Sequence, residues 1–149
     1  MNYEDIPYGY AHCYATAEQC PQCNHCLRHH AAVMNEALAT PHERVNCVTT
    51  AYSHKVASGQ PCAHYRSDEP IRYAQGMKGI FDMVPKKLYP QVRNQVINCF
   101  SSERVFYYAQ NGKQLISPAQ QQRIARVFES IGLAAPTYTH YIMRPNWDS

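Results

Sequence analysis

The sequence predicts an α+β protein that is mainly α with little β structure. Two observations support this fold class. Residues 1–30 are rich in cysteine, histidine and proline without an apolar period, whereas residues 85–132 repeat apolar side chains every three or four positions. A chain of 149 residues fits one domain or two small, tightly joined parts. We therefore expect a loop-rich, metal-stapled module over residues 1–70, packed on a basic helical module over residues 71–149.

The helices of the C-terminal half are expected from their end signals. A helix that begins near Tyr89 tolerates Pro90 in its first turn, and its apolar period continues to about residue 100. Residues 103–110 follow a serine that can cap a second, short helix, and Asn111-Gly112 can end that helix in a left-handed conformation. The sequence therefore predicts two consecutive helices with a very short connection.

The last helix has the clearest signals in the chain. Ser117 is a suitable N-cap, Pro118 suits the first turn, and Gln120 completes a capping box. Gly132 would end this helix, and its apolar face consists of Ile124, Val127, Phe128 and Ile131. The tail from residue 134 is rich in proline and tyrosine, and we expect an irregular strap that packs through Tyr138, Tyr141 and Trp147.

The N-terminal half offers weaker signals. Good helix formers predict a helix over residues 28–39, with an apolar stripe of Val33, Ala37 and Leu38. The β-branched run at 45–52 predicts a short strand. Residues 71–84 are ambiguous, because their apolar residues fall at helical spacing without clear end signals.

The cysteine cluster is the most informative chemical feature. Cys13, Cys20, Cys23 and Cys26 have the spacing C-x6-C-x2-C-x2-C, and Cys62 follows after a turn. Four thiolates on a short loop can make a closed tetrahedral Zn²⁺ site with Zn–S distances of about 2.3 Å. Three interpretations stay open. They are a structural zinc site with three loop cysteines and Cys62, a 4Fe–4S cluster suggested by C-x2-C-x2-C, and metal-free thiols with Cys20 and Cys23 as a redox pair.

Other residues could contribute to such a site. His29, at the start of the first expected helix, could complete a site of three cysteines and one histidine. Cys47 and Cys99 are expected as small buried side chains. Seven cysteines are an odd number and do not indicate a disulfide framework.

Several short motifs together resemble a known family. They are Asn2-Tyr3-Glu4-Asp5-Ile6-Pro7-Tyr8, Cys20-Pro21 with Cys26-Leu27-Arg28, Cys62, Tyr73-Ala74-Gln75-Gly76 and Ser117-Pro118-Ala119-Gln120-Gln121. Over nearly its whole length the chain resembles a family of short hypothetical proteins of the Bacteroides group, a domain of unknown function. The resemblance implies no activity. It does imply a ligand set of Cys13, Cys20, Cys26 and Cys62, with Cys23 and Cys47 as additions in this chain and Cys23 and His29 as substitute ligands.

The two halves of the chain differ in charge. Residues 1–70 contain seven acidic and four basic residues, whereas residues 71–149 contain four acidic and ten basic residues. A basic half can attract nucleic acid, so a second interpretation is a DNA-binding, helix-turn-helix-like regulator. A partner protein is the other kind of partner that this asymmetry allows.

In the DNA-binding interpretation the helix over 103–110 enters the groove. Arg104 and Tyr107 would be exposed, Lys113 would reach a phosphate, and Val105 and Tyr108 would face the core. The connection to the preceding helix is too short for a complete motif, and a packing unit with solvated arginines accounts for the same residues.

Other classes of function find little support. The sequence has no Gly-rich phosphate loop, His-Glu-x-x-His motif or nucleophile elbow, so we do not expect an enzyme. No apolar run is long enough to span a bilayer. The N-terminus, Met1-Asn2-Tyr3-Glu4-Asp5, lacks the features of a secretory signal, from which we expect a cytoplasmic protein. The expected function is a metal-binding protein with a regulatory or interaction role.

Overall fold

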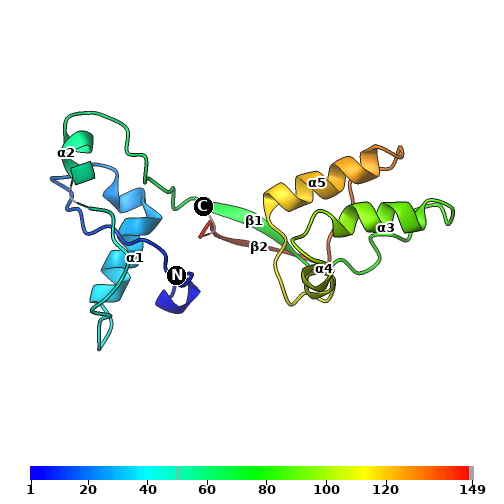
Figure 1. Ribbon diagram of the computed structural model, residues 1–149, viewed down its shortest axis with the longest axis horizontal. Coiled ribbons are helices and arrows are strands. Elements are labelled where there is room, and N and C mark those ends of the chain that lie inside the picture. Colours follow the sequence, from blue (N-terminus) through cyan, green and yellow to red (C-terminus); the bar gives the residue numbers. More distant parts are fainter. Residues whose placement is uncertain (50, 148–149) are drawn as a thin grey trace. The chain divides into compact units, whose positions relative to one another are not determined.

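A computed structural model describes the chain from residue 1 to residue 147, apart from residue 50 and the side chains at 53 and 54. The described elements are the helices α1 (Leu27–Glu36), α2 (Ala51–Ala57), α3 (Tyr89–Ile97), α4 (Glu103–Gln110) and α5 (Pro118–Glu129), the short 3₁₀ helices η1 (Tyr3–Asp5) and η2 (Cys23–His25), and the strands β1 (Pro70–Gln75) and β2 (His140–Pro145) (Figure 1). The expected α+β fold with more helix than strand is confirmed. Among the described helices, none combines the length and apolar character that crossing a bilayer requires.

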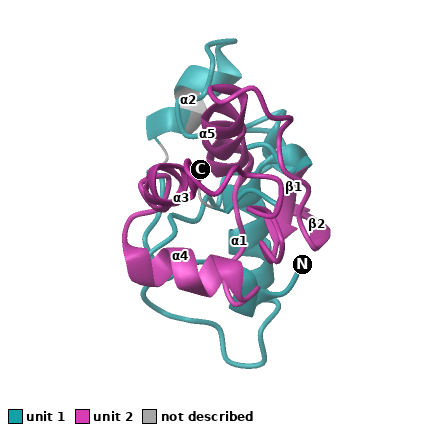
Figure 2. Cartoon of the chain, turned by 90° about the vertical axis from the view of Figure 1, so that its right-hand side faces the viewer, with its two compact units in different colours: residues 1–70, 145–149 teal, residues 71–144 magenta. Residues whose placement is uncertain are grey.

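The chain divides into two compact units (Figure 2). Unit 1 consists of residues 1–70 and 145–149, and unit 2 consists of residues 71–144. The C-terminal residues belong to unit 1 because Trp147, only 2% exposed, packs against Leu27 and Ala31 of α1. Both ends of the chain therefore contribute to unit 1, and unit 2 is inserted between them in the sequence.

Helix α1 is the centre of unit 1. Its buried residues are Leu27, Ala31, Ala32 and Asn35, which lie on one face at helical spacing. The predicted apolar stripe is wrong, because Val33 is 48% exposed. The face with small alanines is the one that allows the close approach of the Trp147 ring. The helix also ends at Glu36, three residues earlier than expected.

Helices α4 and α5 begin where their capping signals predict. The Ser117 hydroxyl accepts a hydrogen bond from the Gln120 N–H (3.2 Å), and the Gln120 side chain accepts one from the Ser117 N–H (3.0 Å). The Ser102 hydroxyl likewise accepts a bond from the Val105 N–H at the start of α4. Together with α3, these two helices enclose an apolar core that includes Val92, Val96, Phe106, Ala109, Ile124 and Phe128.

The core-facing side of α4 differs from the expectation. Phe106 and Ala109 are fully buried, whereas Tyr108 is 36% exposed and Val105 is only partly buried. Phe106 fills the core because its ring buries a large apolar area without a hydroxyl that needs a partner.

The strands of unit 2 form a two-stranded sheet that the sequence did not reveal. The Thr139 N–H donates to the Gly76 carbonyl (3.1 Å), so the residue after β1 meets the residue before β2 and the strands run antiparallel. The Arg72 guanidinium lies 4.5 Å from the centre of the Tyr141 ring across this pair. The tail that was expected to be irregular is therefore partly a strand.

The strand predicted over residues 45–52 is wrong. Residues 45–49 are irregular except for a single bridge between Cys47 and His12, and residues 51 and 52 begin α2. A β-branched run becomes a strand only when a neighbouring strand pairs along it. In the described part of unit 1, residues 45–49 pair with a neighbouring segment only at the bridge between Cys47 and His12.

Candidate metal centre

The three loop cysteines lie on consecutive tight turns. The Cys23 N–H donates to the Cys20 carbonyl (3.2 Å), and the Cys26 N–H donates to the Cys23 carbonyl (3.1 Å). Side chains three residues apart eclipse each other in this kind of turn. The C-x2-C-x2-C spacing therefore brings the three thiols to one side of the chain, directly before α1.

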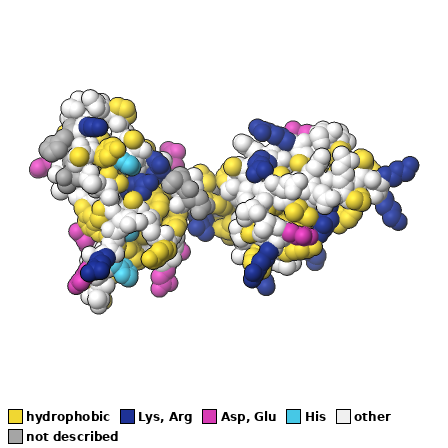
Figure 3. Space-filling model, viewed as in Figure 1, with side chains coloured by type: hydrophobic (Ala, Val, Ile, Leu, Met, Phe, Trp, Pro, Cys, Tyr) yellow, Lys and Arg dark blue, Asp and Glu magenta, His cyan; other side chains and the backbone are white. Residues whose placement is uncertain are grey.

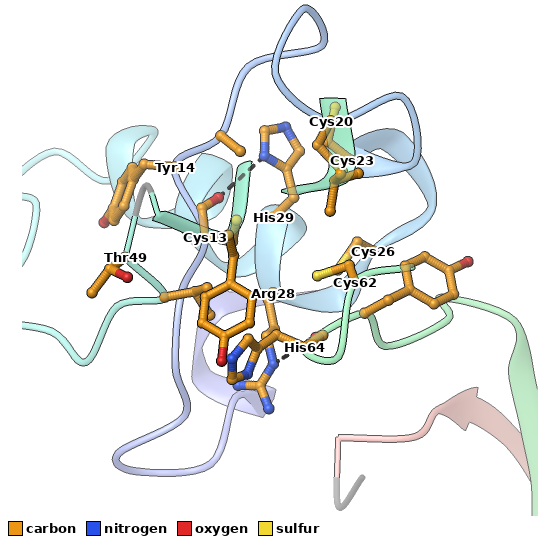
Figure 4. Close-up of a pocket in the computed structure, with 15 residues that line it drawn as sticks. Cys13, Tyr14, Cys20, Cys23, Cys26, Arg28, His29, Thr49, Cys62 and His64 are labelled. Atoms are coloured by element: carbon orange, nitrogen blue, oxygen red, sulfur yellow. Dashed lines mark hydrogen bonds between the residues drawn. The ribbon is translucent and has the colours of Figure 1, made fainter. Parts of the chain in front are cut away.

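Two further thiols reach the same place from other segments. The Cys13 N–H donates to the Arg28 carbonyl (2.8 Å), which ties the N-terminal loop to the first turn of α1. Cys62 follows a turn in which Gly59 has a φ of 90°. The five thiols line one cavity of about 60 Å³, and they are Cys13, Cys20, Cys23, Cys26 and Cys62 (Figure 4).

Arg28 holds the cavity-lining segments together. Its Nε donates to the His64 carbonyl (2.9 Å), and one terminal nitrogen donates to the Ala11 carbonyl (3.1 Å). The guanidinium also lies 4.9 Å from the centre of the Tyr10 ring. The remaining walls are mainly apolar or aromatic and include Val48, Tyr52, Val56 and Tyr65. The thiols therefore line a cavity whose surrounding segments are joined by the hydrogen bonds of Arg28.

The thiols in the cavity influence each other. Burial is the main cause that raises the pKa of Cys13, a backbone hydrogen bond at Ala15 lowers it, and the neighbouring thiols Cys26, Cys20 and Cys62 raise it further. Burial also raises the pKa of Cys20, with a smaller opposing effect of a backbone hydrogen bond. These two groups are therefore thiols at neutral pH in the metal-free chain, and a metal ion would have to displace their protons.

The cavity contains every residue of the predicted ligand set. Cys13, Cys20, Cys26 and Cys62 line it, and so do the substitute ligands Cys23 and His29. The family resemblance implied that Cys23 is an addition, although the three-residue spacing of Cys23 from both neighbours is the signal for its position in the cavity. His64 also lines the cavity and was not expected there.

The other two cysteines lie elsewhere. Cys47 is exposed, which contradicts the expected burial, and Cys99 is buried in unit 2 as expected. As the side chains are placed in the described part of the chain, no three His, Cys, Asp or Glu side chains form a group that could hold a metal ion.

The residues of the DNA-binding interpretation lie on and after α4. The Arg104 Nε donates to the Tyr108 hydroxyl (2.9 Å), and the Tyr107 hydroxyl accepts a bond from Arg93 (2.7 Å). Lys113 is exposed just beyond the helix. On the face seen in Figure 3, the Lys and Arg side chains of unit 2 are spread over several separate places. DNA binding through Arg104, Tyr107 and Lys113 stays a prediction.

The fold and the cavity together define a class: an α+β protein with a cysteine-lined cavity in its N-terminal unit. The chain belongs to DUF6078, a family of unknown function, whose pattern matches residues 1–147. This match includes both units and confirms the expected domain of unknown function over nearly the whole chain. No curated protein and no solved structure matches the chain.

Proposed function

We propose that unit 1 is a zinc-binding module in which Cys13, Cys20, Cys26 and Cys62 hold one structural Zn²⁺. The observation that carries this proposal is the convergence of these thiols, from three separate segments, on a single cavity of about 60 Å³. Thiolates are the usual ligands of structural zinc, and four of them complete a tetrahedron. To hold the ion, the side chains that line this cavity must turn their sulfurs toward one point, at a distance of about 2.3 Å from the metal.

The small apolar core of unit 1 supports the need for a metal. Its buried members around α1 are Leu27, Ala31 and Trp147, far fewer than those of the core of unit 2. Zinc binding in small domains contributes on the order of 10–16 kcal/mol, which is comparable to the whole stability of about 5–15 kcal/mol of a typical domain. A bound ion would therefore supply stability that the side-chain packing of this unit lacks.

An iron–sulfur cluster is the main alternative occupant. The cavity offers enough thiols for a 4Fe–4S cluster, which needs four cysteine ligands. The two occupants differ in composition, because a cluster contains iron and sulfide and a zinc site contains neither. A zinc site with four thiolates has no open position for a substrate, so the proposed role is to shape a binding module and not to catalyse a reaction.

The experiment that tests the proposal is a metal analysis of the full chain, purified without a His-tag. We expect one equivalent of zinc in the unmodified protein. Single Cys→Ser variants at positions 13, 20, 26 and 62 should lose it, while Cys47→Ser should retain it, because Cys47 is exposed and does not line the cavity. Cys23→Ser should also retain the ion, since Cys23 is not in the proposed ligand set.

Three results would contradict the zinc proposal. Purified protein without any bound metal would contradict the proposal, and so would a full equivalent of zinc in Cys62→Ser. A brown protein that contains iron and sulfide in place of zinc would show that the same thiols hold a cluster.

A further inference from the structure

Unit 2 contains a cleft that is separate from the cysteine cavity. It lies where the end of β1, the turn after it, the end of α4 and the start of β2 meet, and its volume is about 680 Å³. Sites for small molecules are typically about 300–1,000 Å³. The cleft therefore has room for a ligand of the size of a metabolite, and its lining residues all belong to unit 2.

Glycines with unusual backbone conformations line this cleft. Gly76, Gly79 and Gly112 have φ angles of 82°, 78° and 76°. At Gly76 a Cβ atom would lie only 2.9 Å from the Thr139 Oγ1, so the close approach of the two segments also requires glycine. Because these residues have no side chains, backbone groups form a large part of the cleft wall.

The carbonyl groups of the wall already accept hydrogen bonds. The carbonyls of Gly76, Gln110 and Gly112 accept bonds from the Thr139 N–H (3.1 Å), the Met77 N–H (3.3 Å) and the Gln75 side-chain amide (2.9 Å). The negative end of α4 therefore does not present free carbonyl oxygens from Gln110 and Gly112 to a ligand.

Hydrogen-bond donors remain available in the same cleft. Within the described residues, neither the Lys78 N–H nor the Gly79 N–H donates to a backbone carbonyl. The Lys78 side chain is exposed and has no carboxylate within ion-pair distance in that part of the chain. Asn111 and His140 add side-chain nitrogens to the wall. The cleft therefore offers backbone N–H donors and one lysine ammonium, beside the amide and hydroxyl oxygens of its other side chains.

We propose that this cleft binds the phosphate group of a small phosphorylated ligand. A phosphate carries negative charge and several acceptor oxygens, which backbone N–H groups of a glycine-framed turn and a lysine ammonium satisfy together. The motif Tyr73-Ala74-Gln75-Gly76, which the zinc proposal does not use, has its role here: Gln75 and Gly76 build the cleft wall. This inference is independent of the zinc proposed for unit 1.

The test is a titration of the full, ¹⁵N-labelled chain with inorganic phosphate at constant ionic strength, followed by NMR. We expect saturable shifts of the amide signals of Gly76, Gly79 and Gly112. Parallel titrations use acetate and chloride. The absence of saturable shifts with phosphate would overturn the proposal, and so would equal shifts with acetate or chloride, because the cleft would then show no preference for phosphate.

Charge variants sharpen the test. Lys78→Gln should weaken phosphate binding at least about tenfold, because it removes a charge-assisted contact. The control is Lys113→Gln, a lysine directly after Gly112 that does not line the cleft, and it should leave the affinity unchanged. Asp82 lies beside Gly79, with its Oδ2 2.9 Å from the position of a Gly79 Cβ, so Asp82→Asn should strengthen binding. Equal weakening by both lysine variants would show a nonspecific charge effect and overturn the inference.

Discussion

Cysteines in this chain occupy three kinds of surroundings. Five of them line the cavity of unit 1, Cys47 is exposed, and Cys99 is buried in the core of unit 2. The Cys99 thiol donates to the Gln95 carbonyl (3.4 Å). Burial raises the pKa of Cys99, although the nearby Arg123 guanidinium lowers it in part. Burial and protonation both protect this thiol, because the thiolate is the reactive form.

Alkylation of the native protein should distinguish these surroundings. With iodoacetamide at neutral pH, we expect Cys47 to be modified first and Cys99 only after denaturation, as read by peptide mass spectrometry. The thiols that line the cavity should react more slowly with zinc bound than after its removal, because bound thiolates are unavailable. Modification of Cys99 as fast as that of Cys47 would contradict the buried position of Cys99.

Tyr138 is a partly buried residue whose hydroxyl is itself buried. Its oxygen is inaccessible to solvent and has no hydrogen-bond partner among the described residues. Burial, with smaller contributions from Tyr141 and Cys99, raises the pKa of Tyr138 well above its ordinary value. Below about pH 10 the side chain is neutral in both the folded and unfolded states. Above that pH it ionises only in the unfolded chain, so the folded state loses stability as the pH rises.

Tyr138→Phe should remove this loss of folding stability at alkaline pH. At neutral pH we expect the free energy of unfolding to be unchanged or to rise by about 1 kcal/mol, because the variant no longer buries an unpaired hydroxyl. Urea denaturation of both proteins at neutral and alkaline pH measures the difference, which should grow in favour of the variant above about pH 10. A loss of more than about 1 kcal/mol at neutral pH would show that the hydroxyl has a stabilising partner.

At the scale of elements, the helices of unit 2 depend on local contacts. The capping box of α5 joins Ser117 and Gln120 through two hydrogen bonds, and the Gln121 side chain donates to the carbonyls of Arg72 and Ile116. The start of α5 is therefore held by hydrogen bonds both within the helix and to β1. The strands lack such local signals, because the partners of β1 and β2 are separated by the whole helical part of the unit.

Loss of the α5 cap should be measurable. Ser117→Ala removes the hydroxyl that accepts from the Gln120 N–H, and we expect a loss of about 1 kcal/mol in the free energy of unfolding. The matched control is Ser101→Ala, an exposed serine directly before the residue that caps α4, which should change stability by less than about 0.5 kcal/mol. Denaturant titration followed by circular dichroism measures both. Equal effects of the two variants would contradict the capping role.

At the scale of the whole molecule, unit 1 depends on residues from both ends of the chain. Trp147 packs on Leu27 and Ala31 and lies edge-on to the Tyr10 ring at a centroid distance of 5.3 Å. The thiols of the cavity come from the same unit. Since Trp147 is the single tryptophan of the chain, its fluorescence reports on the unit that is proposed to hold zinc.

If unit 1 holds zinc as proposed, removal of the ion should affect the two units differently. With a strong zinc chelator, we expect the emission of Trp147 to shift to longer wavelength as unit 1 opens, because the buried ring becomes solvated. The amide signals of α4 and α5 should keep their folded positions, since unit 2 has its own apolar core. Cys47→Ser serves as a control and should respond as the unmodified protein does. An unchanged emission on complete removal of zinc would contradict a structural role for the ion.

Local signals were sufficient to place α4 and α5, because the hydroxyls of Ser102 and Ser117 bond to backbone groups only three residues away. The clustering of three thiols was also readable from their spacing, since a tight turn repeats every three residues. The pairing of β1 with β2, the packing of Trp147 in unit 1 and the approach of Cys13 and Cys62 to the loop thiols were decided in three dimensions. These contacts join residues that are far apart in the chain, and their energy comes from burial and pairing that exist only after the segments have met.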